Sequence, residues 1–277
     1  MIVFKKRSEI TKYLSKTNGS IGYVPTMGAL HAGHLSLLEK SARENEITVC
    51  SIFVNPLQFN NASDLEKYPR TLPADMALLI ECGCDILFAP EADEMYQHED
   101  DKSLQFEVGF LDQLFEGAFR PGHFMGVAVV VNKFFQIIQP TNAYFGLKDY
   151  QQCMLIKKLV ADLKIPIKLH LCPTLRESDG LAMSSRNSRL SVEARKVASK
   201  IVEALNYAKL NYRTQNITLV EQWCKSHLAE EPLYSVEYFN IVNAETLLPV
   251  KHEDEPAVAL CAANLGGVRL IDNMVLN

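Results

Sequence analysis

Short apolar stretches alternate with helix-patterned stretches in the first part of this 277-residue chain, and this alternation constrains the fold most. A strand that is buried on both faces reads as a β-branched or apolar run, whereas an amphipathic helix repeats its apolar residues every three or four positions. Alternating strands and helices favour a parallel sheet with helices on both faces. The expected strands are residues 21–25, 47–54, 85–89, 143–145 and 167–172, and the expected helices are 30–44, 75–82, 127–138 and 149–163.

The remainder of the chain has a different pattern. Helices are expected at residues 191–210, with Ser191 as a candidate N-cap, and at 219–228. Strands are expected at 234–242, 257–263 and 267–272. Helices followed by strands indicate a smaller α+β unit. We therefore predict two domains, residues 1–175 and 176–277, divided in a polar loop ahead of Gly180.

Composition excludes several classes of protein. The net charge of −5 gives no basic surface for wrapping nucleic acid. No segment reaches the roughly 20 apolar residues of a membrane span, and residues 1–16 lack the apolar core of a signal peptide. Seven scattered cysteines, an odd number, are typical of reduced thiols. We expect a cytoplasmic protein without nucleic-acid or membrane partners.

The stretch PTMGALHAGH, residues 25–34, lies between an expected strand and an expected helix. In an open α/β sheet this is the crevice where ligands bind. His31 and His34 are three residues apart, so they share one face of a helix, and a helix N-terminus beside two imidazoles suits a polyphosphate. A metal site is an alternative, although no third ligand stands nearby. A surface pair at a helix start is another.

Two further loops carry polar side chains. Asn55 and Gln58 lie in FVNPLQF, residues 53–59, directly after a strand. Their neutral amides can hold a hydroxyl or a carboxylate, or they can simply stabilise the loop. Arg120 in RPGHF can pair with a carboxylate or phosphate, or it can be a solvated loop side chain.

Two later strings suit phosphate. In FGLKDYQQ, residues 145–152, Lys148 supplies a point cation and Asp149 can cap the following helix. In RESDGLAMSSRN, residues 176–187, small hydroxyls stand beside Arg186. Serine can donate to phosphate oxygens while arginine neutralises them, but Ser-Ser-Arg alone is a weak pattern.

Together these strings resemble the pantothenate synthetase family, which consists of pantoate–β-alanine ligases within the HxGH nucleotidylyltransferase superfamily. The matching strings run from about residue 20 to residue 190, and the C-terminal third carries fewer of them. Leu147 departs from the family, which usually has Gln or Glu there. The resemblance implies a Rossmann-like doubly wound sheet, with the smaller domain forming a lid over the active site.

The resemblance also implies a reaction. The carboxylate of pantoate attacks the α-phosphorus of ATP and releases pyrophosphate, and the amine of β-alanine then attacks the pantoyl adenylate and releases AMP. ATP is a substrate, Mg²⁺ accompanies it with no protein side chain assigned as a metal ligand, and the family is expected to be homodimeric. Positioning and charge stabilisation supply the catalysis.

Site residues follow from the matched strings. Catalytic roles are implied for His34, the candidate proton donor, and for His31, Lys148, Ser184, Ser185 and Arg186. ATP contacts are implied for Met27, Gly28, Ala29, Leu30, His31, Ala32, Gly33, His34, Gly146, Leu147, Lys148, Asp149, Leu175, Met183, Ser184, Ser185 and Arg186. Contacts to pantoate or β-alanine are implied for Pro25, Thr26, Met27, Asn55, Gln58, Arg120 and Gln152.

Two rival functions remain open from the sequence. One is a different nucleotidylyltransferase of the superfamily, which would lack the FVNPxQF and FGxKDYQQ strings. The other is a non-catalytic nucleotide-binding protein that kept the fold. Such proteins usually lose catalytic side chains, whereas both histidines, Lys148 and the Ser-Ser-Arg run are present here.

Overall fold

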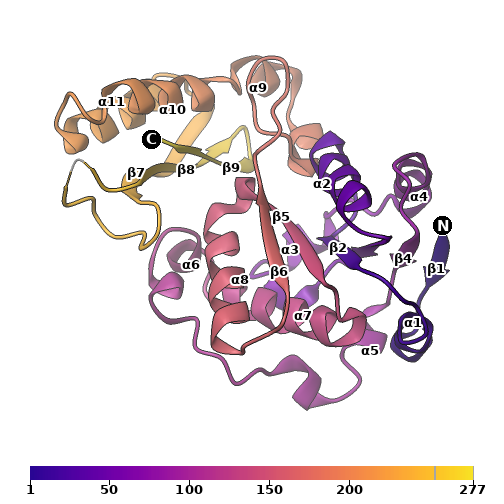
Figure 1. The fold of residues 1–277 in the computed structure, drawn as a ribbon. Helices are drawn as coiled ribbons and strands as arrows, with labels where there is room; N and C mark the ends of the chain where they lie inside the picture. The colour runs from indigo at the N-terminus through magenta and orange to yellow at the C-terminus, as the bar shows by residue number, and fades with distance from the viewer. Residues whose placement is uncertain (253, 277) are drawn as a thin grey trace. The chain divides into compact units, whose positions relative to one another are not determined.

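The computed structural model describes residues 1–252 and 254–276, and its chain forms two compact units (Figure 1). The first unit comprises Met1–Leu147 and Gln151–Pro173, and the second comprises Lys148–Tyr150 and Thr174–Asn277. The sequence analysis divides the chain between residues 175 and 176 and leaves 148–150 in the first domain. In the structure, this short segment groups with the second unit although it lies between two elements of the first.

The first unit is built on six parallel strands in the order β1-β4-β3-β2-β5-β6. The strands are β1 (Ile2–Phe4), β2 (Ile21–Thr26), β3 (Ile47–Ile52), β4 (Ile86–Phe88), β5 (Asn142–Gly146) and β6 (Lys168–Cys172). The predicted parallel α/β sheet is confirmed. Strand β1 was not predicted, because it has three residues and is largely exposed at the edge of the sheet.

Adjacent residues of β2 show how both faces of this sheet are covered. Tyr23 points to a face where its ring lies 5.9 Å from that of Phe134 in α7 (His123–Ile138). Val24 points to the opposite face and joins the core cluster of Leu37 and Leu38 in α2 (Ala32–Glu44). Because successive side chains of a strand point to opposite faces of the sheet, the apolar residues of β2 contribute to the core on each face.

The remaining helical elements of the first unit connect its successive strands. They are α1 (Arg7–Leu14), η1 (Pro56–Gln58), α3 (Ala62–Glu66), α4 (Leu72–Glu81), α5 (Ala92–Met95), η2 (Glu99–Lys102), η3 (Gly109–Gln113), α6 (Glu116–Phe119) and α8 (Tyr150–Asp162). The 3-10 turn η4 (Leu147–Asp149) precedes α8. Helix α1 escaped sequence prediction because only two of its eight residues, Ile10 and Leu14, are buried.

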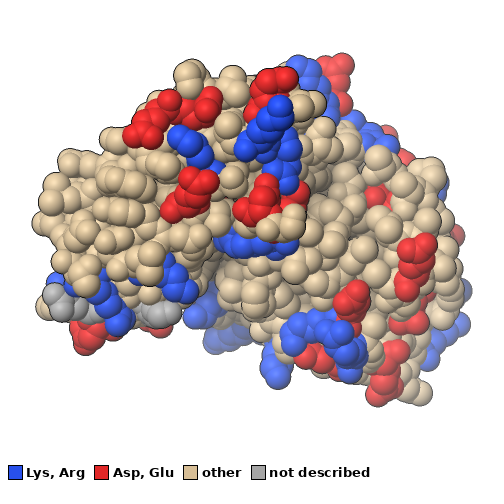
Figure 2. Space-filling view, turned by 90° about the horizontal axis from the view of Figure 1, so that it is seen from above, with Lys and Arg blue, Asp and Glu red and all other residues tan. Residues whose placement is uncertain are grey.

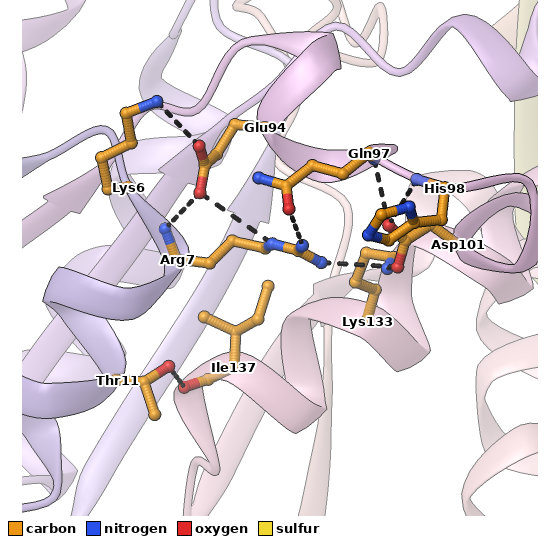
Figure 3. A network of polar contacts seen from close by, with 9 residues as sticks. All are labelled: Lys6, Arg7, Thr11, Glu94, Gln97, His98, Asp101, Lys133 and Ile137. Atoms are coloured by element: carbon orange, nitrogen blue, oxygen red, sulfur yellow. Dashed lines mark hydrogen bonds and ion pairs between the residues drawn. The ribbon is translucent and has the colours of Figure 1, made fainter.

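A polar network ties the start of α1 to residues 94–101 (Figure 3). Glu94 accepts from the Lys6 ammonium and from the backbone N–H of Arg7, both at 2.9 Å. The Arg7 guanidinium reaches Asp101 at 3.4 Å, and Asp101 also pairs with Lys133 of α7. The Lys133 ammonium holds the pKa of Asp101 well below its usual range. The network therefore holds the segment between Glu94 and Asp101 against two helices.

The second unit packs helices on a three-stranded antiparallel sheet. The strands are β7 (Tyr234–Asn243), β8 (Ala257–Leu265) and β9 (Val268–Val275), and the helices are α9 (Val192–Val197), α10 (Lys200–Asn211) and α11 (Ile217–Ala229). Helices α10 and α11 lie side by side over the sheet (Figure 1). They share a core with it that includes Leu205, Val220 and Phe239. The predicted smaller α+β unit is confirmed.

One predicted helix is wrong. Residues 191–210 were expected to form a single helix, but the structure has α9 and α10 with an interruption at Ala198 and Ser199. There Ala198 N–H donates to Arg195 O and Val202 N–H donates to Ser199 O, so three-residue bonds replace the four-residue bonds of an α-helix. Ser191 does cap α9, accepting from Ala194 N–H at 3.2 Å.

Charge and thiol groups are distributed without a dominant feature. Acidic and basic side chains are interspersed on the face drawn in Figure 2. In the part of the chain that the structure describes, no helix is long and apolar enough to cross a membrane.

All seven cysteines are free, and six of them are buried, with Cys82 partly exposed. Burial raises the pKa of the Cys84 thiol to about 12.

Candidate active site

The loop after β2 begins with a fixed hydroxyl. Thr26 donates its hydroxyl proton to Ser51 O of β3 at 2.8 Å and accepts from Gly28 N–H at 3.2 Å. Gly28 has a φ of +84°, and a Cβ there would lie 3.1 Å from both the Asp75 carboxylate and the Ile52 side chain. Glycine therefore lets the chain turn in the narrow space at the end of the strand.

Asp75 holds the next two residues of this loop and was missed by the sequence analysis. Its carboxylate accepts from Ala29 N–H at 3.0 Å, from Leu30 N–H at 2.8 Å and from the Thr71 hydroxyl at 3.1 Å. Asp75 is 2% exposed, and Ala29 has a φ of +50°, a left-handed conformation that is costly for a residue with a side chain. Because Asp75 occupies both amides, any ATP contact at Ala29 or Leu30 uses other atoms.

The His31 and His34 rings lie together, although His31 is outside the helix in which the sequence analysis placed both residues. The helix starts at Ala32, and His31 is its N-cap in an extended conformation, with Nδ1 accepting from Gly33 N–H at 3.2 Å. The His31 and His34 rings are 4.1 Å apart between centroids. With Nδ1 as acceptor, the proton of a neutral His31 ring is on Nε2, which makes that atom a donor.

The side-chain amide of Asn55 makes four hydrogen bonds to other residues of the protein. It is 1% exposed, and its Nδ2 donates to Gln58 Oε1 at 3.0 Å and to Gly126 O at 3.1 Å. Its Oδ1 accepts from Leu57 N–H at 3.2 Å and from the Tyr96 hydroxyl at 2.7 Å. Two donated and two accepted bonds fill the capacity of a primary amide. The loop-stabilising alternative therefore describes Asn55 in this structure.

Gln58 is oriented by Asn55 and remains suited to a ligand. Because its Oε1 accepts from Asn55, its Nε2 points the other way, where it meets Met27 Sδ at 3.2 Å. A thioether is a weak acceptor, so a ligand oxygen can replace it at little cost. Gln58 is the residue of this loop with a donor available for exchange.

Tyr96 and Gly126 position this loop, and neither is among the site residues predicted from the sequence. The Tyr96 hydroxyl donates to Asn55, and burial raises the pKa of Tyr96, so the hydroxyl keeps its proton. A Cβ on Gly126 would lie 2.2 Å from Leu57 O, which shows how closely α7 approaches η1. Tyr96 follows a short helix in an irregular region and has no sequence signal of its own.

Arg120 also contacts this loop. Its guanidinium donates to Gln58 O at 3.4 Å and to His123 Nε2 at 3.1 Å, and it pairs with Glu116 at 3.7 Å. His123 Nδ1 lies 2.8 Å from the same Gln58 carbonyl, which can only accept. His123 is therefore neutral, with its proton on Nδ1.

The two glutamines of the FGLKDYQQ string have different surroundings. Gln151 is 4% exposed, and its amide bonds the backbone at Leu111, Leu114 and Glu116. Gln152 is half-buried on the next position of α8. Gln151 is thus a structural residue, and the ligand contact implied for Gln152 stays a prediction.

The second unit positions Lys148 through its backbone. Lys148 lies in the single turn η4, with its ammonium 3.5 Å from the Asp149 carboxylate. Its carbonyl accepts from Asn273 Nδ2 at 2.9 Å, and the Tyr150 hydroxyl donates to Ala244 O at 2.7 Å. These two bonds attach residues 148–150 to the second unit.

Residues 175–183 form a small hairpin in the second unit. Met183 N–H donates to Leu175 O at 3.0 Å, and Arg176 bridges to Ala182. The Arg176 guanidinium binds both carboxylate oxygens of Asp272, at 2.6 and 3.0 Å. Burial raises the pKa of Asp272, and the Arg176 charge opposes that shift. A bidentate pair in this geometry fixes the base of the hairpin.

The Ser-Ser-Arg run follows the hairpin directly. Ser184 caps the turn η5 (Ser185–Arg189), with its hydroxyl accepting from Arg186 N–H at 3.2 Å. Arg195 of α9 binds Glu177 at 2.5 Å and also pairs with Asp179. Residues 176 to 179 are therefore bonded to both β9 and α9.

The predicted site residues divide between the units. The first unit holds Pro25, Thr26, Met27, Gly28, Ala29, Leu30, His31, Ala32, Gly33, His34, Asn55, Gln58, Arg120, Gly146, Leu147 and Gln152. The second holds Lys148, Asp149, Leu175, Met183, Ser184, Ser185 and Arg186. Within residues 1–252 and 254–276, no group of three or more His, Cys, Asp or Glu side chains can hold a metal ion.

Comparison with known proteins decides the family. The sequence model of the pantoate–β-alanine ligase family matches residues 2–275. The chain belongs to this family. It is 48% identical to the pantothenate synthetase of Cytophaga hutchinsonii, over 94% of this chain and 93% of that one. It is 42% identical to the Flavobacterium psychrophilum pantothenate synthetase, with both chains fully covered.

Solved structures agree with the sequence relatives. The pantothenate synthetase from Thermus thermophilus superimposes with a TM-score of 0.94 at 42% identity, covering 100% of this chain and 99% of that one. A Francisella tularensis pantoate–β-alanine ligase, solved with β,γ ATP and β-alanine, gives 0.84 at 36% identity, covering 100% and 98%. The predicted family, fold class and ligase activity are confirmed.

Proposed function

We propose that this ligase condenses pantoate with β-alanine through a pantoyl-adenylate. The observation that carries the proposal is the joint presence of the His31–His34 pair, the Gln58 amide and the Lys148 cation on loops that the protein itself holds in place. The reaction needs activation, because a carboxylate does not react with an amine while its leaving group is oxide.

The adenylation step places negative charge on the triphosphate. His31 Nε2 and the His34 ring supply imidazole groups at the start of α2, where backbone N–H groups and the helix dipole favour anions. Lys148, Ser184, Ser185 and Arg186 supply the remaining cations and hydroxyls. His34 is the proposed proton donor. Fixed donors aimed at developing charge stabilise a transition state without reorganisation.

Pantoate is proposed to bind in the first unit. Gln58 Nε2 would exchange its weak thioether partner for a pantoate oxygen, while Asn55 and Tyr96 keep the amide in one orientation. Gln152 is the second amide. Pro25, Thr26 and Met27 line the same strand end. Arg120 acts through Gln58 O and His123 in this structure, so its role in binding pantoate is proposed to be indirect.

Three further parts belong to the same proposal. Mg²⁺ would be held by phosphate oxygens of ATP, which suits a cation that usually binds phosphates and keeps several waters, and it would neutralise phosphate charge. The second unit would act as the lid over the active site. The enzyme would be a cytoplasmic homodimer, which light scattering tests by giving twice the mass of the chain.

ATP–pyrophosphate exchange tests the proposed chemistry. Exchange that requires pantoate, measured before β-alanine is added, is the expected result. If pantothenate forms on adding β-alanine while exchange is absent, the adenylate intermediate is wrong. If a folded sample shows neither activity, the ligase assignment gives way to a nucleotide-binding protein that lost catalysis.

A further inference from the structure

The last strand of the second unit contacts two segments that the proposed function assigns to ATP. Asp272 of β9 binds Arg176 at the base of the hairpin that precedes the Ser-Ser-Arg run. The next residue, Asn273, donates from Nδ2 to Lys148 O at 2.9 Å. These segments are far apart in sequence, and two consecutive residues of one strand reach both.

Asn273 is itself firmly held. It is 6% exposed and pairs with Leu260 of β8 in the sheet. Its N–H donates to Asp272 Oδ1 at 2.7 Å, and its carbonyl accepts from Arg176 Nη2 at 3.0 Å. A side chain on so constrained a backbone has few conformations to lose when it makes a hydrogen bond.

Lys148, in contrast, sits on a weak local scaffold. It lies in a three-residue 3-10 turn, a geometry with poorer hydrogen bonds than an α-helix, between β5 and α8. Its side chain is long and has high rotamer entropy. A small shift of this turn would be magnified at the ammonium, so a fixed anchor on the backbone matters for where the charge is presented.

The chemistry of the anchor fits a phosphate site. A side chain that holds a carbonyl must donate, and an amide does so without adding a negative charge beside the triphosphate. A carboxylate at this position would repel both the Lys148 carbonyl and the phosphates. The side-chain amide of Asn273 therefore donates a hydrogen bond to the Lys148 carbonyl without carrying a charge.

We propose that Asn273 is a positioning residue, which sets the place of the Lys148 ammonium and fixes its spacing to the hairpin held by Arg176. This inference rests on the proposed role of Lys148 in binding ATP. It assigns a function in the reaction to a strand outside the strings that carry the family resemblance.

A double-mutant cycle in ATP–pyrophosphate exchange tests the proposal. Asn273→Ala is expected to lower kcat/KM for ATP about tenfold, and Lys148→Ala to lower it further. In the Lys148→Ala background, Asn273→Ala is expected to add less than about a twofold loss, because the group it positions is gone. A merely structural role would give the same loss in both backgrounds.

Controls separate the possible failures. Asn240→Ala removes a half-buried amide from β7 of the same sheet and is expected to leave kcat/KM unchanged. If Asn273→Ala does not fold, Asn273→Ser, whose hydroxyl is too short to reach Lys148 O, takes its place. Equal losses in both backgrounds overturn the positioning role alone. Wild-type exchange in Lys148→Ala overturns the Lys148 assignment and the inference with it.

Discussion

The two units hold the residues predicted to contact ligands in different ways. In the first unit, loops at the ends of parallel strands are held by buried side chains of neighbouring helices, as Asp75 holds Ala29 and Leu30. In the second unit, the hairpin and the Lys148 turn are held by ion pairs and an amide from an antiparallel sheet, chiefly Arg176–Asp272 and Asn273. The supporting residue lies in a helix in the first arrangement and in a strand in the second.

This difference has a consequence for mutation. The first unit spreads its support over several bonds per loop, so the loss of one bond should reduce activity in part. In the second unit, two bonds hold the Lys148 turn, from Asn273 and Tyr150, and this turn presents a charged group directly, so the loss of that group should have a larger effect on adenylation. The predictions below test this contrast, beginning with the largest expected change.

Lys148→Ala should reduce the adenylation rate by about 10²–10³-fold, the cost of losing one group that stabilises transition-state charge. The fold should persist, because the Lys148 contact that ties the turn to β9 comes from its backbone carbonyl. Pyrophosphate exchange measures the effect. Lys158→Ala, which removes a lysine paired with Asp162 on α8, should retain wild-type rates. Unchanged exchange in Lys148→Ala would remove the contrast between the units.

His31→Asn separates the N-cap role of His31 from its predicted role in catalysis. Asparagine is a good N-cap, so α2 should keep its stability while the imidazole is lost, and activity should fall about 100-fold. His31→Ala should lose activity and also about 1 kcal/mol of unfolding free energy. Exchange kinetics and urea unfolding measure the two effects. A fully active His31→Asn variant would mean that His31 serves the helix alone.

Asp75→Asn tests the buried support of the loop. An amide can accept from one of the two N–H groups of Ala29 and Leu30, but its own N–H₂ group then faces the other donor. We expect a loss of about 1–3 kcal/mol in unfolding free energy, with about a tenfold fall in kcat/KM for ATP. Chemical unfolding and exchange assays measure both. A loss of activity as large as that of Lys148→Ala would contradict the interpretation that several bonds share the support of this loop.

Asp101→Asn should have the smallest effect and should change stability with pH. The folded pKa of Asp101 is lowered by Lys133, so the unfolded chain, with a pKa near 3.9, takes up the proton first. The stabilisation is complete at pH 7 and is lost as the pH falls below about 5. At pH 7 the variant should lose at most about 1 kcal/mol.

Urea midpoints at pH 7 and at about pH 3.5 measure this pH dependence. The difference between wild type and Asp101→Asn should narrow at the lower pH. Asp162→Asn, on the exposed surface of α8, is the control for the change in charge. An equal difference at both pH values would mean that the network in Figure 3 does not stabilise the unit through the Asp101 charge.

The sequence predicted what depends on local pattern. Buried strands and the strings that follow them are contiguous, so β2 with its PTMGALHAGH loop and β5 with its FGLKDYQQ loop could be read directly. The site residues that were missed act at a distance. Asp75 is 46 positions from Ala29, Tyr96 is 41 from Asn55, and Asn273 is 125 from Lys148. No periodicity or motif spacing reports such contacts.

Local rules also misplaced some details. His31 was expected inside a helix, but its ring nitrogen accepts from Gly33 N–H, which makes it the residue before the helix. The substrate contact that the resemblance implies for Asn55 stays a prediction, and its four bonds to the protein became visible only when η1, α7 and Tyr96 were placed together. Thr71 precedes α4 without making a side-chain cap bond, so the local pattern gave no signal for Asp75.

The positions of the cysteines allow local unfolding of each unit to be followed by thiol labelling. Cys50 and Cys84 lie in the core of the first unit, and Cys224 and Cys261 in that of the second, all with pKa values raised by burial. Only Cys82 is partly exposed in the folded state. A thiol reagent is therefore expected to modify Cys82 before the core cysteines, each of which reacts only while its own unit is open. The order in which the core cysteines are labelled shows which of the two units unfolds locally at the lower free energy.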